Sequence, residues 1–103
     1  MPIKRDSSES PNTLFAIWIN EILMQACPDA SVFSPAIEES RLMYLIAAAE
    51  QSGDPAWEQC YDIFQTTKKT KVSELLDLML RAKINMAAVY TRLVSSIPVR
   101  YRA

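Results

Sequence analysis

The fold depends most on residues 71–96, which read KVSELLDLMLRAKINMAAVYTRLVSS. Apolar side chains recur in this stretch at alternating spacings of three and four residues, the period of one helix face. The members of this seam are Val72, Leu75, Met79, Ala82, Met86, Val89 and Leu93. Pro98 cannot continue a helix because it has no backbone N–H. We therefore expect one continuous helix over about 71–96, with a seam of the kind that pairs helices in coiled coils.

Two shorter helices are expected before it, separated by the only glycine in the chain, Gly53. The first of them has a start signal at Ser34, a good N-cap, followed by Pro35 at the first helical position. Gly53 is placed to take the left-handed conformation that ends this helix. Asp54-Pro55 then starts a short helix with one apolar stripe, formed by Trp57, Cys60, Tyr61 and Phe64.

The first helix is expected over 12–26, with Asn12 or Thr13 as its N-cap. Its sequence is apolar nearly all round, so we expect it to be buried on most sides. Cys27-Pro28 ends it. The predicted fold class is therefore all-α, a small bundle of about four helices with a long C-terminal amphipathic helix.

The length of 103 residues indicates one domain, which we expect over 12–103 after a flexible polar tail at 1–11. No apolar run approaches the ~20 residues that cross a bilayer, and the tail has no apolar core of a signal peptide. We expect a cytoplasmic protein in which Cys27 and Cys60 are reduced, half-buried thiols. A disulfide between them stays open as the alternative for a chain outside the cytosol.

Catalytic chemistry has little to use in this sequence. Histidine is absent, so Ser-His-Asp and Cys-His arrangements are excluded, and two distant thiols cannot complete an ordinary zinc site. The paired carboxylates, Glu38 with Glu39 and Glu58 with Asp62, fall near helix starts, where acidic side chains stabilise the helix end. We expect no enzyme, no cofactor and no metal site.

Charge is divided unevenly along the chain. Residues 1–66 carry three basic and ten acidic side chains, whereas residues 67–103 carry eight basic and two acidic ones. The two halves could pack together and cancel, or the split could drive association between copies or with an acidic partner. A small nucleic-acid-binding or regulatory protein is the alternative; its phosphate contacts would come from Lys68, Lys69, Lys71, Lys83, Arg92, Arg100 and Arg102.

Association with another protein is the function that the pattern favours. The first and last helices carry more apolar surface than a bundle of this size easily covers, and exposed apolar area marks interfaces. We expect an adaptor, chaperone-like or assembly subunit whose partner is a second copy of itself or another helical protein. The predicted partner-binding residues are Leu75, Met79, Met86, Val89, Tyr90 and Leu93 on the last helix and Trp18 on the first.

One resemblance bears on this hypothesis. A Ser-rich start, a helical middle and the terminal helix pattern Val72-Ser73-Glu74-Leu75-Leu76-Asp77-Leu78-Met79-Leu80 through Leu93-Val94 look similar to the inner-rod and needle subunits of bacterial type III secretion systems. Those subunits polymerise through such a helix, which implies a structural subunit of a secretion apparatus. The pattern covers about thirty residues. The hydrophobic first half and the Pro98 to Arg102 end depart from that family.

Overall fold

The computed structural model describes residues 10–26 and 35–97, and within these ranges all regular structure is helical. The all-α prediction is confirmed. Among the described residues, five helices follow one another in the order α2 (Pro11–Ala26), α3 (Pro35–Gln51), α4 (Trp57–Thr66), α5 (Val72–Arg81) and α6 (Met86–Ser96). None of them is long and apolar enough to cross a membrane. The predictions for Ser34, Cys27 and most of the tail at 1–11 lie outside the described residues.

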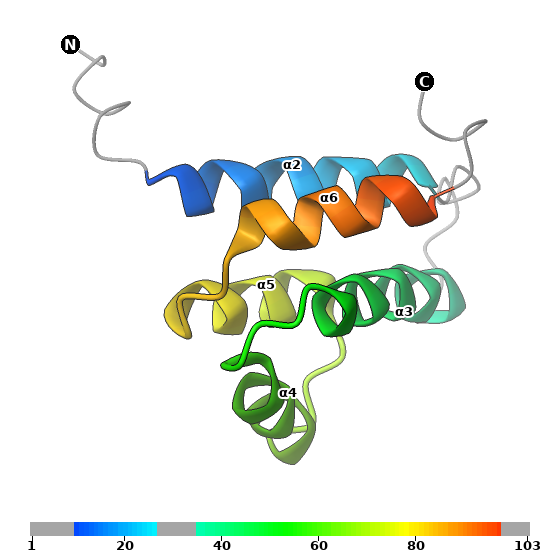
Figure 1. The fold of residues 1–103 in the computed structure, drawn as a ribbon. Coiled ribbons are helices and arrows are strands. Elements are labelled where there is room, and N and C mark those ends of the chain that lie inside the picture. Colours follow the sequence, from blue (N-terminus) through cyan, green and yellow to red (C-terminus); the bar gives the residue numbers. More distant parts are fainter. Residues whose placement is uncertain (1–9, 27–34, 98–103) are drawn as a thin grey trace, which may run out of the picture.

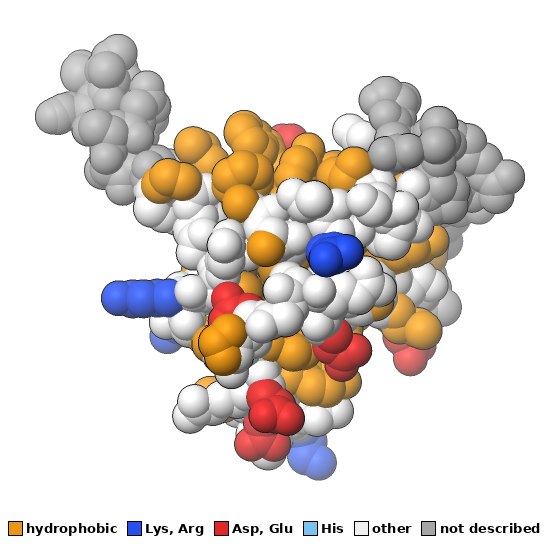
Figure 2. Space-filling view, in the orientation of Figure 1, with side chains coloured by type: hydrophobic (Ala, Val, Ile, Leu, Met, Phe, Trp, Pro, Cys, Tyr) orange, Lys and Arg blue, Asp and Glu red, His pale blue; other side chains and the backbone are white. Residues whose placement is uncertain are grey.

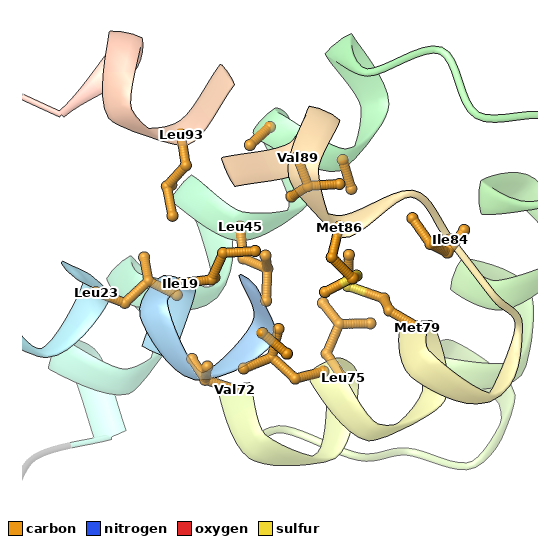
Figure 3. Close-up of a cluster of buried hydrophobic side chains, with 14 of the residues drawn as sticks. Ile19, Leu23, Leu45, Val72, Leu75, Met79, Ile84, Met86, Val89 and Leu93 are labelled. Carbon is orange, nitrogen blue, oxygen red and sulfur yellow. The ribbon is translucent and has the colours of Figure 1, made fainter. Parts of the chain in front are cut away.

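The helices form two layers with one core between them. Figure 1 shows α2 and α6 side by side in one layer, α3 and α5 in the layer beneath, and α4 beyond α5. The helix α6 packs mainly against α2 and α3, and α5 touches α2, α3 and α4. Every helix contributes apolar side chains to the core, and Figure 3 labels some of those from α2, α3, α5 and α6. The largest fully buried side chains, which include Ile84 and Ile97 outside the helices, are Ile19, Leu23, Leu45, Leu75, Met79, Ile84, Met86, Val89, Leu93 and Ile97.

Local sequence signals place most helix ends correctly. Helix α3 begins at Pro35, and Gly53 takes φ +71° just after its end, as predicted. A carboxylate oxygen of Asp54 accepts the N–H of Ala56 at 2.9 Å, directly before α4. The expected N-cap of the first helix is wrong. Ser10 caps α2 instead, since its Oγ accepts the N–H of Thr13 at 3.2 Å.

The continuous helix expected over 71–96 is also wrong, because the chain breaks after Arg81 and restarts at Met86. Lys83 takes the left-handed φ of +60°, which reverses the chain. Its N–H donates to the C=O of Leu80, and the N–H of Ile84 donates to the C=O of Met79, both at 3.0 Å. These two bonds are the Schellman motif that ends helices, with lysine where glycine is the usual residue.

The backbone groups freed by the break are paired by three side chains. Asn12, at the start of α2, donates to the C=O of Ile84 and accepts the N–H of Met86. Asp54 accepts the N–H of Asn85, and the side chain of Asn85 caps α6 by accepting the N–H of Ala88. The break is thereby stabilised, and both halves of the seam fold onto the same core. A single straight helix would extend beyond that core.

Candidate interaction surface

The predicted seam lies inside the protein. Leu75, Met79, Met86, Val89 and Leu93 are fully buried, each with an exposed fraction of 0%. The break folds α5 and α6 against α2, α3 and α4, so the seam that was predicted to face a partner faces the chain itself. In this folded chain, these five residues are core residues, and no partner can reach them at the surface.

Trp18 and Tyr90, the other two predicted partner-binding residues, lie together. Trp18 on α2 packs edge-to-face against Phe15, with ring centroids 5.1 Å apart, and lies 6.1 Å from the ring of Tyr90 on α6. Phe15 and Tyr90 are 5.5 Å apart. Tyr90 and Phe15 are half-buried, whereas Trp18 is 44% exposed. The rings of Phe15 and Tyr90 therefore hold the indole of Trp18 in place at the surface, between α2 and α6.

The exposed side of α2 carries four large apolar side chains together with the polar residues Asn20, Glu21 and Gln25. Ala16, Ile19 and Leu23 form its buried stripe. On the other side, large apolar residues are exposed by 40–50%, and we call these four the α2 face: Leu14, Ile17, Trp18 and Met24. Figure 2 shows hydrophobic side chains gathered along this edge of the molecule. The expectation that the first helix is buried on most sides is wrong, because in two layers a helix meets the core on one side only.

A shallow groove of about 380 Å³ runs between α2 and α5 beside the α2 face. Ile17, Leu76 and Leu80 supply apolar lining, and Glu21 and Asp77 supply two carboxylates. Asp77 already forms an exposed ion pair with Arg81 one turn along α5, at 3.1 Å. The groove widens the apolar surface that α2 offers.

The thiol and carboxylate groups that the sequence offered for catalysis serve the packing and the helix ends of the fold. Cys60 is buried between α4 and the rest of the protein, and this burial raises the pKa of its thiol. A buried thiol with a raised pKa is a poor nucleophile. Glu38 accepts the N–H of Val72 at 2.7 Å, so this carboxylate caps the start of α5. Within the described ranges, no group of three or more His, Cys, Asp or Glu residues could hold a metal ion.

Glu38 also faces Arg41, the one buried charged residue of the described chain. The Arg41 guanidinium is 3.6 Å from Glu38, one helical turn away. The Nε and Nη2 atoms of Arg41 have no hydrogen-bond partner among the described residues. This ion pair lies at the junction of α3 and α5 and fixes the carboxylate that caps α5.

The charged halves of the sequence do pack together, since α6 contacts α2 and α3. Both ion pairs of the described residues nevertheless join neighbours within one helix. Lys68 and Lys83 occupy positive-φ positions after α4 and α5.

Comparison with known proteins identifies no relative, since no family model, curated protein or solved structure matches the chain. The functional argument therefore depends on the geometry of the surface.

Proposed function

We propose that this protein is a non-catalytic protein–protein interaction module, and that it buries the α2 face against a second copy of itself. The single observation that carries the proposal is the exposure of four large apolar side chains along one side of α2, Trp18 among them. Large apolar side chains gathered on one exposed helix side mark interfaces more often than chance, although Glu21 and Gln25 are also exposed on this helix. An adaptor or assembly subunit uses a surface of this kind.

Trp18 is the expected centre of the contact. Tryptophan is enriched among the residues that dominate binding energy, because it buries a large apolar area and loses little conformational entropy. The packing of Trp18 against Phe15 and Tyr90 orders the ring before a partner arrives. An ordered anchor binds more tightly because its entropy has already been lost on folding.

The non-catalytic part of the proposal is supported by what the reactive groups do. The Glu38 carboxylate caps α5, and the Cys60 thiol is buried with a raised pKa. The sequence contains no histidine to act as a base near neutral pH. The groups that remain at the surface of α2 suit packing against another helix.

Sedimentation equilibrium over a micromolar concentration range tests the proposal. We expect the wild-type protein to form a dimer, and Trp18→Ser to weaken the association by about tenfold or more. Met43→Ser is the matched control, since Met43 is 65% exposed but lies on α3. This control is expected to leave the dimer unchanged. Far-ultraviolet circular dichroism checks that both variants stay helical.

A wild-type protein that stays monomeric at several hundred micromolar would contradict self-association through α2. Equal weakening by Trp18→Ser and Met43→Ser would show that association is a general property of exposed apolar residues. Either outcome removes the assignment of the α2 face as the site of self-association.

A further inference from the structure

We infer that α5 and α6 can straighten into one helix, and that α6 then packs into the corresponding place in a second copy of this chain. The product is an exchanged dimer in which each copy completes the core of the other. This inference does not use the α2 face, so it stands or falls separately from the proposed function. It follows from the conflict between the sequence of the hinge, residues 82–85, and the structure that the hinge adopts.

The hinge sequence is compatible with a helix. It reads Ala82-Lys83-Ile84-Asn85, without the glycine or proline that would interrupt a helix. Ala82 itself keeps helical angles, and the chain departs from the helix only over the next three residues. The seam also keeps its three- and four-residue spacing through the hinge, from Met79 to Met86. A continuous helix over 72–96 would be about 37 Å long.

The folded-back hinge is strained. Lys83 adopts φ +60°, a conformation that a residue with a Cβ avoids. Figure 1 shows the consequence, since α5 and α6 run in opposite directions in different layers. Short hinges under strain are the places where proteins exchange elements between copies. Straightening the hinge returns Lys83 to ordinary helical angles.

Straightening also replaces the hydrogen bonds that hold the break. In the folded-back hinge, the C=O of Ile84 and the N–H of Met86 are paired by Asn12, 72 and 74 residues away in the sequence. In a continuous helix, both groups are paired within the helical ladder. The opened hinge therefore leaves none of these backbone groups unpaired.

Exchange keeps the core contacts of α6. Met86, Val89 and Leu93 are fully buried, and α6 packs mainly on α2 and α3. A copy that has opened its hinge exposes these side chains together with the empty place on α2 and α3. A second open copy supplies the same helix for that place, so the contacts that α6 makes in the monomer form again between copies, whereas Ile84 of the hinge leaves its buried position. The hinge and the protein concentration then decide between monomer and exchanged dimer.

Refolding at ~0.5 mM, followed by size-exclusion chromatography with light scattering, tests the inference. Lys83→Gly relieves the strain of the folded-back hinge and disfavours the straight helix, so we expect the dimerisation constant to fall by about tenfold or more. Asn85→Ala removes the α6 cap and favours the helix, so it is expected to raise the constant by a similar factor. Lys68→Gly is the matched control, because Lys68 has φ +55° after α4, outside the hinge. It is expected to leave the constant unchanged.

Electron-electron distance measurement identifies the exchanged form. One chain carries two spin labels, on Ser73→Cys and Ser95→Cys, and has Cys27 and Cys60 replaced by alanine so that no other thiol is labelled. Unlabelled protein is added in excess, so that the measured distance is the one within a single chain. A straight helix places these positions about 33 Å apart. A dimer fraction with this distance supports exchange. Exchange is overturned if wild type and Asn85→Ala both stay monomeric. It is also overturned if the dimer shows the same distance between the two labels as the monomer. A dimer that Trp18→Ser abolishes and Lys83→Gly leaves unchanged also overturns exchange and supports the α2 face.

Discussion

The side-chain amide of Asn12 bridges the break between α5 and α6. Its nitrogen donates to the C=O of Ile84 at 2.7 Å, and its oxygen accepts the N–H of Met86 at 3.1 Å. One side chain at the start of α2 thus pairs a backbone C=O inside the break and the first backbone N–H of α6. These two hydrogen bonds connect α2 to the start of α6 and stabilise the turn between α5 and α6.

Asn12→Ala is expected to lower the free energy of unfolding by about 2 kcal/mol, because it leaves two partly buried backbone groups without partners. Asn20→Ala is the control, since Asn20 is exposed on the same helix and should change stability by less than about 0.5 kcal/mol. Urea unfolding at low protein concentration measures both. Equal effects from the two variants would show that the bridge does not stabilise the fold.

Lys83→Gly is expected to raise the free energy of unfolding by about 1 kcal/mol. Glycine takes a positive φ without steric cost, whereas lysine at φ +60° is strained. Arg92→Gly, at an exposed position inside α6, should destabilise by about 1 kcal/mol because glycine disfavours a helix. Thermal and urea unfolding of both variants show whether Lys83→Gly raises and Arg92→Gly lowers the free energy of unfolding. A destabilised Lys83→Gly protein would contradict the strain at this position.

Met86→Glu is expected to unfold the protein. Met86 has no exposed surface, and a carboxylate there would be buried without a partner. Met43→Glu, on the exposed side of α3, should leave the circular dichroism spectrum unchanged. If Met86→Glu instead gave a folded monomer, Met86 would be an interface residue, as the sequence pattern predicted.

The Cys60 thiol should make stability depend on alkaline pH. Burial raises the pKa of Cys60 above its ordinary value of 9.0, so the folded protein keeps the thiol protonated where the unfolded chain loses the proton. The contribution of Cys60 is complete below pH 9.0 and declines as the pH rises through the folded pKa. Urea unfolding of wild type and Cys60→Ala at a series of pH values measures the contribution of Cys60 to the free energy of unfolding. The difference between the two should shrink above about pH 9. A constant difference up to pH 10.5 would contradict the raised pKa.

Sequence signals that act over a few residues were sufficient for much of the fold. Pro35 and Gly53 mark the two ends of α3, because each restricts or permits the backbone angles of its own position. The stripe of Trp57, Cys60 and Phe64 predicts the buried side of α4, since helical period alone places these residues together. The all-helical class follows from the same local patterns.

Two features could not be predicted without the tertiary structure: the break that divides the expected last helix, and which side chains are exposed at the surface. Asn12 and Asp54, which stabilise the break, lie far from it in the sequence, so no window along residues 71–96 contains them. The same break turns the seam inward, which leaves the α2 face as the candidate interaction surface. Helical period shows which side chains share a face, and only the packing of the helices decides which face meets the core and which meets water.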